Sequence, residues 1–252
     1  MNLRNVLFVI VIFMFTSVLF VKPLNLVTFE YPPYEYTQNA ELKGMAVDIV
    51  KLVFKEMEQP ITIEVLPWAR AISYIKEGKR DAIFTAFKNP QREKFADYST
   101  VLIPQVVSLF VRKDFSLEYN GDLNKISDVR IGVVRKVSYG KLFDKAVSDK
   151  LLKKIEPVND GTQNFRRLLS GRIDVVVSNT DGAFFILNQL NQAHNISELS
   201  PKLQAVPSYM AFSKKRNLLE IRDKFDFILN KLKKDGTYRK IIESYSKKIV
   251  LK

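Results

Sequence analysis

The sequence predicts an α/β fold made of two units, each a doubly wound, mainly parallel sheet with helices on both faces. Two observations carry this prediction. Apolar runs typical of strands alternate with amphipathic runs typical of helices, first over about sixty residues from Leu24 and again from Ile131 onward. Extended segments join the two units, which indicates two lobes that face each other across a ligand cleft.

The chain begins with a segment that we do not expect to belong to the fold. Arg4 is followed by an uncharged apolar run from Val6 to Val21, whose length is nearer to a secretory signal than to a membrane-spanning helix. The small-x-small cleavage pattern is poor, since Thr16 and Val18 are the best pair. We interpret residues 1–21 as an export signal, with cleavage favoured over retention as a membrane anchor. Either form places the rest of the chain outside the cytoplasmic membrane, and we expect a periplasmic protein.

The first unit begins with a strand, Leu24 to Phe29, that runs into the loop EYPPYEY. The two prolines of that loop stop both helix and strand pairing, so Glu30 and Tyr31 lie on a rigid loop at the end of the strand. The segment LKGMAVDIVKLVFKEME then repeats apolar residues at helical spacing. A second strand, Ile61 to Leu66, ends at a proline followed by Trp68. A lone tryptophan at a strand exit indicates a stacking surface, with a packed core position as the alternative.

A helix from Ala69 to Glu77 follows, and the stretch DAIFTAFKNPQREKFADYS then predicts a short strand, a loop and the start of another helix. Asn89 suits the N-cap and the proline after it suits the first helical position. Arg92 lies in the first turn, beside the partly positive helix N-terminus. This stretch therefore offers a site for a carboxylate or another small anion. The alternative from these residues alone is a surface ion pair of Arg92 with Glu93 or Asp97.

The second unit repeats the alternation, and polar residues again follow its strands. Arg135 and Ser138 follow the first strand within the turn RKVSYG, and Asn179 and Asp181 follow the last within NTDG. Doubly wound sheets bind ligands outside the carboxyl ends of their strands, so we expect these strand exits to converge. The remaining expected elements are strands at Ala82–Phe84, Val106–Val111, Ile131–Val134, near Ile155, Ile173–Ser178 and Tyr209–Ser213, with helices up to Asp149, at Thr162–Ser170, after Gly182, over Ile221–Leu232 and over TYRKIIESY.

Composition excludes several classes of function. The chain has 252 residues, a net charge of +13, one histidine and no cysteine. Its lysines and arginines are scattered among acids without a recognisable nucleic-acid module, so we expect no nucleic-acid partner. The lack of cysteine excludes disulfides, thiolate nucleophiles, iron–sulfur clusters and Cys-based zinc sites. His194 stands alone in a polar run. We therefore expect neither a metal nor a cofactor.

The order of motifs resembles the family-3 periplasmic solute-binding proteins, the receptors for amino acids and similar small solutes in ABC-type uptake systems. The motifs are YPPYEY, LKGMAVDIVKLVFKEM, GKRDAIF, NPQREKFADYS, GRIDVVVS and DGTYRKIIESY. EYPPYEY with PWARA and AF-x-x-P-x-RE resembles a branch of that family whose ligands are mostly unassigned. The resemblance implies a two-lobed periplasmic-binding-protein-like fold. Residues 22–103 plus 208–252 would form lobe 1, and residues 104–207 would form lobe 2.

The resemblance also implies roles for residues in lobe 1. Arg92 matches the arginine that clamps the α-carboxylate of the ligand, and Tyr31 matches the aromatic residue that stacks on the ligand. Thr85 and Asn89 fall where small or hydroxyl residues contact that carboxylate.

In lobe 2, the resemblance places Arg135 and Ser138 in a turn that is normally rich in glycine and threonine. The acidic residue that usually binds the ammonium group of the ligand aligns with Asn179, which is neutral. Asp181 or Glu30 could supply that charge instead. If neither does, another small carboxylate becomes a candidate ligand.

The expected function is an extracytoplasmic receptor that captures a small carboxylate-bearing solute, an amino acid or a related compound, by lobe closure. It would deliver that solute to the membrane permease of an ABC system, as a monomer and without catalytic residues. Two alternatives stay open. One is a periplasmic sensory protein that uses the same closure. The other is a lyase similar to cyclohexadienyl dehydratases, for which Glu30 is the best-placed acid or base.

Overall fold

The computed structural model describes residues 21–250, with side chains described as far as residue 245. The predicted export segment therefore lies outside the described residues except for Val21. Within the described range no helix is long and apolar enough to cross a membrane.

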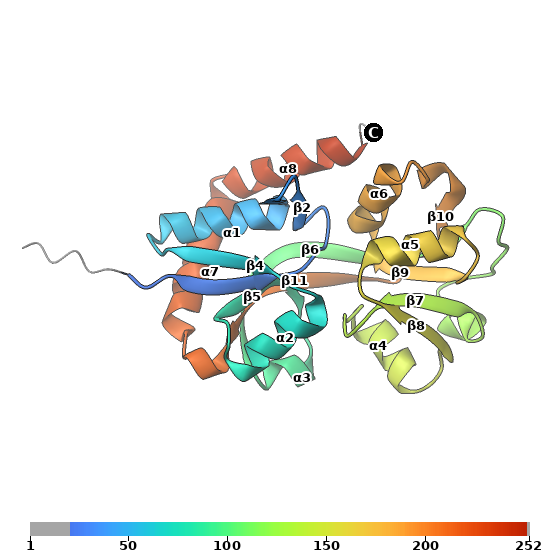
Figure 1. The fold of residues 1–252 in the computed structure, drawn as a ribbon, viewed down its shortest axis with the longest axis horizontal. Coiled ribbons are helices and arrows are strands. Elements are labelled where there is room, and N and C mark those ends of the chain that lie inside the picture. Colours follow the sequence, from blue (N-terminus) through green and yellow to red (C-terminus); the bar gives the residue numbers. More distant parts are fainter. Residues whose placement is uncertain (1–20, 251–252) are drawn as a thin grey trace, which may run out of the picture.

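The fold is α/β and two-lobed, as predicted. Its main sheet has the strand order β4-β1-β5-β11-β6-β9-β7-β8, with β10 paired to β6. Lobe 1 lies at one end and lobe 2 at the other, and β6 and β11 run between them (Figure 1). The main-sheet strands are β1 (Leu24–Thr28), β4 (Ile61–Val65), β5 (Ala82–Phe87), β6 (Ala96–Arg112), β7 (Arg130–Val134), β8 (Lys154–Val158), β9 (Val175–Asn179), β10 (Ile196–Glu198) and β11 (Gln204–Ser213).

Parallel pairing in each lobe reflects the βαβ alternation of the sequence. In lobe 1, β1 pairs in parallel with β4 and with β5. In lobe 2, β7 pairs in parallel with β8 and with β9. The carboxyl ends of these strands face the junction of the lobes (Figure 1). A small hairpin, β2 (Tyr36–Gln38) with β3 (Glu41–Lys43), stands apart from the main sheet.

Helices cover both faces of the sheet in each lobe. In lobe 1, α1 and α7 bury apolar residues in one core and α2 in the other; in lobe 2, α5 and α6 share one core and α4 packs in the other. The helices are α1 (Met45–Glu56), α2 (Trp68–Glu77), α3 (Pro90–Glu93), α4 (Lys141–Ser148), α5 (Gly161–Leu169), α6 (Thr180–Gln189), α7 (Leu219–Lys234) and α8 (Thr237–Val250), with short 3-10 turns at Leu123–Ile126, Ala193–Asn195 and Lys214–Arg216.

The first crossing strand, β6, is longer than the sequence predicts. The sequence predicts strands at Val106–Val111 and Tyr209–Ser213 and crossing segments near Leu102–Val106 and Ala205–Ser208, whereas β6 has 17 residues and β11 has 10. Each strand contains a proline, which normally interrupts a ladder because it lacks an N–H donor. Pro104 lies opposite Pro207, so the two residues without a donor share one position of the ladder.

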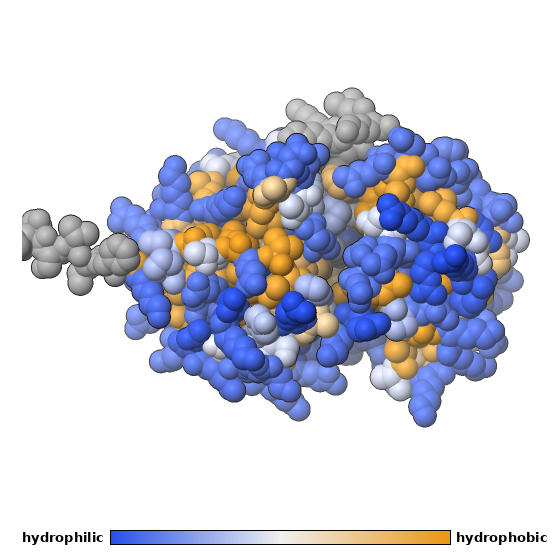
Figure 2. Space-filling model, in the orientation of Figure 1, coloured by the Kyte–Doolittle hydropathy of each residue, from blue (hydrophilic) through white to orange (hydrophobic). Residues whose placement is uncertain are grey.

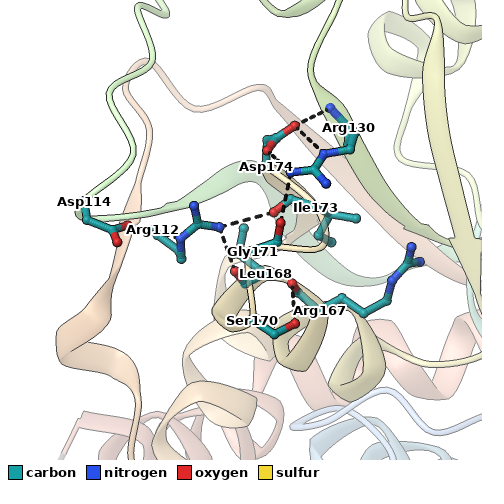
Figure 3. Close-up of polar contacts among 9 residues, drawn as sticks. All are labelled: Arg112, Asp114, Arg130, Arg167, Leu168, Ser170, Gly171, Ile173 and Asp174. Carbon is teal, nitrogen blue, oxygen red and sulfur yellow. Dashed lines mark hydrogen bonds and ion pairs between the residues drawn. The ribbon is translucent and has the colours of Figure 1, made fainter.

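Polar contacts fasten α5 to the sheet at the outer end of lobe 2 (Figure 3). Arg130 binds Asp174 through Nη2–Oδ1 at 2.7 Å and Nε–Oδ2 at 3.0 Å. The hydrogen bonds from Arg130 hold the pKa of the Asp174 carboxyl below its ordinary value. Arg112 Nη1 donates to the Leu168 carbonyl at 2.9 Å, which satisfies the C-terminus of α5.

Candidate functional site

A cavity of about 470 Å³ lies between the lobes, at the carboxyl ends of the parallel strands. The space-filling view shows the surface hollowed between the two lobes (Figure 2). The walls of the cavity come from the segments after β1 and β4 in lobe 1 and from the segments after β7, β8 and β9 in lobe 2. This placement is the one expected for a ligand site of a doubly wound sheet.

Four of the predicted site residues line this cavity: Glu30, Tyr31, Trp68 and Asn179. A second, much smaller space of about 10 Å³ adjoins it and is lined by Tyr31, Trp68, Thr85, Arg92 and Ser138. That volume is close to the minimum that holds one water molecule. The structure therefore brings together most of the predicted residues, but it divides them between two adjacent spaces.

Arg92 is a buried residue, so the surface ion-pair alternative is wrong. Its side chain and backbone are 7% exposed, and Glu93 and Asp97 pair instead with Lys88 and Lys214. Burial lowers the pKa of the Arg92 guanidinium. An arginine nevertheless stays charged inside a protein, so its donors need acceptors.

Backbone carbonyls from both lobes supply those acceptors. Arg92 Nη1 donates to the Phe87 carbonyl at 2.8 Å, and Nη2 donates to the Lys136 carbonyl of lobe 2 at 3.1 Å. The guanidinium carbon lies 4.8 Å from the centre of the Trp68 ring, and Trp68 Nε1 also donates to the Lys136 carbonyl at 2.7 Å. Trp68 is 4% exposed, so it is both a packed residue and a wall of the cavity.

Tyr31 lies at the contact of the two spaces. Its ring stacks on Phe29 with centroids 5.1 Å apart, and its hydroxyl donates to Gln105 Oε1 at 2.9 Å. Burial raises the pKa of the Tyr31 hydroxyl well above its ordinary value, and the Asn179 amide offsets part of that rise. Tyr31 therefore presents a neutral aromatic face.

Thr85 binds a carboxyl group that the sequence did not single out. Its hydroxyl contacts both Glu35 Oε1 and the Phe84 carbonyl, the latter at 2.7 Å. Glu35 is fully buried, and its Oε2 has no hydrogen-bond partner in the described part of the chain. Burial raises the pKa of the Glu35 carboxyl well above its ordinary value. Thr85 also has a φ of 57°, an unfavourable value for a β-branched residue.

Asn179 is the N-cap of α6, and Asp181 lies in its first turn. Asn179 Oδ1 accepts a hydrogen bond from the Gly182 N–H at 2.6 Å, whereas its Nδ2 has no hydrogen-bond partner among the described residues. Asp181 Oδ2 accepts a hydrogen bond from the Tyr34 hydroxyl of lobe 1 at 2.8 Å. Asp181 thus links the lobes without lining the cavity.

The three remaining predicted residues also lie outside the main cavity. Asn89 is the N-cap of α3 and accepts from the Arg92 N–H at 2.9 Å. Arg135 is exposed on the turn after β7 and lines neither space. Ser138 donates to the Asp144 carboxylate in the first turn of α4.

The cavity also contains residues that sequence reasoning missed. Asp160 and Asn164 come from the N-terminal end of α5, and Tyr36 and Phe185 face each other across the lobes with ring centroids 4.9 Å apart. The sequence DGT at Asp160 is a helix N-cap signal after a strand, which could have identified that residue. Asn164 lies within an amphipathic helix and gives no separate signal. In the described part of the chain no group of three or more His, Cys, Asp or Glu side chains is placed to hold a metal ion.

Comparison with known proteins agrees with the fold. A family model described as bacterial extracellular solute-binding proteins, family 3, matches residues 26–248. The probable amino-acid-binding protein YxeM of Bacillus subtilis is 22% identical over 84% of this chain and 79% of its own length. The arginine-binding extracellular protein ArtP of the same organism is 23% identical over 84% and 81%. A histidine kinase sensor domain similar to periplasmic binding proteins superposes with a TM-score of 0.81 at 18% identity, covering 89% of this chain and 96% of that domain.

Proposed function

The chain belongs to family 3 of the bacterial extracellular solute-binding proteins, and we propose that it is an extracytoplasmic receptor that captures a small amino-acid-type solute between two closing lobes. The observation that carries this proposal is the cavity of about 470 Å³ at the junction, walled by strand ends of both lobes. A receptor needs an enclosed cleft, a few fixed polar groups and a hinge. We further propose that it acts as a periplasmic monomer and passes the solute to an ABC-type permease.

The proposed division into lobes is residues 22–103 plus 208–252 and residues 104–207. Its support is the separation of the apolar cores. Two of the four apolar clusters of described residues take their buried residues from lobe 1, and β11 contributes to them from Met210 onward. The other two clusters take their buried residues almost wholly from lobe 2. Phe87 is an exception, since it belongs to lobe 1 by sequence and packs in a core of lobe 2.

The proposed ligand contacts in lobe 1 are Tyr31, Trp68 and Arg92. A carboxylate that reached Arg92 would replace the Lys136 carbonyl as the acceptor of its Nη2 donor. Because Lys136 belongs to lobe 2, that exchange requires the lobes to shift relative to each other. We regard Arg135 as outside the contact set, since it lines neither space.

A binding role is favoured over a lyase role by the state of Glu30. Both of its carboxylate oxygens already accept hydrogen bonds from Thr37, from the N–H at 3.0 Å and from the hydroxyl at 2.5 Å. A general acid or base needs a free path to the reacting atom and a partner that tunes it. Glu30 is instead a fixed anionic wall of the cavity.

A thermal-shift screen of the full-length protein against amino acids, dicarboxylates and aromatic acids tests the receptor role. A ligand present at about a hundred times its Kd stabilises the folded state by about 2.7 kcal/mol. For a chain of this size the melting temperature should then rise by roughly 5–10 °C. If no compound raises the melting temperature while one is converted to a product detectable by NMR, the protein is an enzyme and the receptor proposal is wrong.

A further inference from the structure

The ligand cavity is acidic in a chain that is strongly basic. The net charge of the protein is +13, yet the described residues that line the cavity include Glu30 and Asp160 and no lysine, arginine or histidine. Glu30 comes from the end of β1 in lobe 1, and Asp160 is the N-cap of α5 in lobe 2. Each lobe therefore contributes one carboxylate to the same space.

Neutral groups hold both carboxylates in place. The oxygens of Glu30 accept hydrogen bonds from the Thr37 N–H and hydroxyl. Asp160 Oδ1 accepts from the Gln163 N–H at 2.9 Å, and its Oδ2 accepts from Gln163 Nε2 at 2.6 Å. In the part of the chain that the structure describes, no lysine or arginine forms a salt bridge with either carboxylate, unlike many acids of the surface. Their charge is thus oriented but not neutralised.

The other walls suit a cation. Aromatic rings from both lobes border the cavity, among them Tyr31, Tyr36, Trp68 and Phe185. The faces of such rings attract guanidinium and ammonium groups, most strongly where water is excluded. A cation with an apolar stem would match both the rings and the carboxylates.

Two buried amides belong to the wall of the cavity. Asn164 and Asn179 are each 1% exposed and line the cavity. Asn164 Oδ1 and Asn179 Nδ2 have no hydrogen-bond partner among the described residues. Both atoms are themselves buried, so a ligand in the cavity would reach them only after neighbouring side chains moved, and the cationic assignment does not depend on them.

The buried cation next to the site, Arg92, does not enter the cavity. Arg92 lines only the small adjoining space, and its described donors go to the Phe87 and Lys136 carbonyls. An anionic ligand in the main cavity would therefore face two carboxylates without a compensating positive side chain among the described lining residues.

We propose that the solute carries a cationic group, a guanidinium or an ammonium on an apolar stem, that binds between the aromatic walls and the Glu30 and Asp160 carboxylates. This inference rests on the receptor function proposed above and names its class of solute. Two sources share this chemistry: a basic amino acid, whose carboxylate would also seek Arg92, and an amine without any carboxylate. A bound cation would also offset the repulsion between carboxylates that closure brings to one cavity.

Calorimetric titration of the full-length protein at low salt tests the proposal. The probes are arginine and lysine, agmatine and putrescine as amines without a carboxylate, and glutamine and glutamate as neutral and anionic comparators. We expect at least one cationic probe to bind more tightly than both comparators. Agmatine that binds as well as arginine would identify an amine as the solute, whereas binding of arginine alone would identify a basic amino acid.

Charge-neutral variants test whether the two carboxylates cause the preference for cationic probes. Glu30→Gln keeps an acceptor for Thr37, and Asp160→Asn keeps a good helix N-cap. Each variant should bind the cationic probe roughly tenfold or more weakly than the wild type, as expected for loss of a charge-assisted contact. The matched control is Asp122→Asn, because Asp122 caps a short helix outside the cavity, and this change should leave affinity unaltered.

Several outcomes would overturn the cationic assignment. Tighter binding of glutamine or glutamate than of every cationic probe would contradict it while leaving the receptor function intact. Wild-type affinity in both Glu30→Gln and Asp160→Asn would do the same. If none of the six probes binds, the cationic assignment is wrong for these solutes, and the broader thermal-shift screen decides separately whether the protein is a receptor.

Discussion

At the scale of single residues, Glu35 is the most unusual group near the site. A hydroxyl group has one hydrogen, so Thr85 cannot donate to both the Phe84 carbonyl and Glu35 Oε1. A protonated Glu35 resolves this conflict, because it can donate to the Thr85 oxygen. Burial raises the pKa of this carboxyl in the same direction, and the neighbouring Glu30 carboxylate adds to the rise. Geometry and electrostatics therefore both favour a neutral Glu35.

Glu35→Gln should make stability less sensitive to alkaline pH. Because the folded-state pKa of Glu35 lies above the unfolded value, its contribution is fully present below about pH 4.3 and is lost as pH rises through the folded pKa. Glutamine cannot ionise, so the melting temperature of the variant relative to wild type should rise between pH 5 and pH 9. Glu58→Gln, at an exposed position, is the control. A difference that stays constant over this range would contradict a raised pKa.

Replacing Arg92 should affect both stability and binding. Arg92→Ala removes the guanidinium donor from the Phe87 carbonyl and leaves the Lys136 carbonyl with Trp68 Nε1 alone, and losing a hydrogen bond from a charged group costs on the order of 2 kcal/mol. The melting temperature of the ligand-free protein should therefore fall, and Arg92→Lys should lower it less. Arg70→Ala, a change at an exposed helical arginine, should have little effect on it.

Titration of the same variants tests the carboxylate contact separately. If a ligand carboxylate reaches Arg92, Arg92→Lys should weaken binding roughly tenfold or more, because an ammonium cannot form the bidentate pair. Wild-type affinity in Arg92→Lys and Arg92→Ala, together with the loss of stability, would assign Arg92 a purely structural role.

At the scale of helices and strands, local signals predicted most of the fold. The prolines of EYPPYEY and the N-cap residues Asn89 and Asn179 lie where their chemistry places them, at strand exits and helix starts. Pairing partners carry no such local signal. The length of β6 depends on β11, which lies about a hundred residues further along the chain, so it could not be derived from either segment alone.

The sequence predicts the part of the candidate site that follows from one rule, namely that the carboxyl ends of the strands converge. This rule places Glu30, Tyr31, Trp68 and Asn179 together, and all four line the cavity. It could not show that Trp68 and the Lys136 carbonyl separate Arg92 from that cavity, because this arrangement depends on contacts between lobes. The same limit explains why Asp160 was missed. Its N-cap role is local, but its position opposite lobe 1 is not.

At the scale of the whole molecule, several contacts join the lobes and hold them closely together. Tyr34 donates to Asp181, Tyr36 packs on Phe185, and the Lys136 carbonyl accepts hydrogen bonds from lobe 1. Among the described strands, only β6 and β11 cross between the lobes. The lobes can therefore separate by breaking these contacts and bending at β6 and β11, which is the geometry of hinge closure.

Closure should be measurable by small-angle X-ray scattering, and Gly182 offers a way to block it. A Cβ on Gly182 would stand 2.7 Å from the Pro32 carbonyl oxygen of lobe 1, closer than real Cβ atoms approach backbone. Addition of a solute identified in the screen should reduce the radius of gyration of the wild-type protein. Gly182→Ala should keep a larger radius at the same solute concentration.

The melting temperature of Gly182→Ala shows whether the effect comes from closure. The added methyl also approaches Asn179 Nδ2 at 2.7 Å within lobe 2, but that amide is the end of a side chain and can move aside. A melting temperature close to that of the ligand-free wild type, with a radius that does not shrink, would assign the effect to contact between the lobes. A wild-type radius that solute leaves unchanged would contradict hinge closure. A Gly182→Ala protein that shrinks as the wild type does would show that Pro32 and α6 do not meet in the bound form.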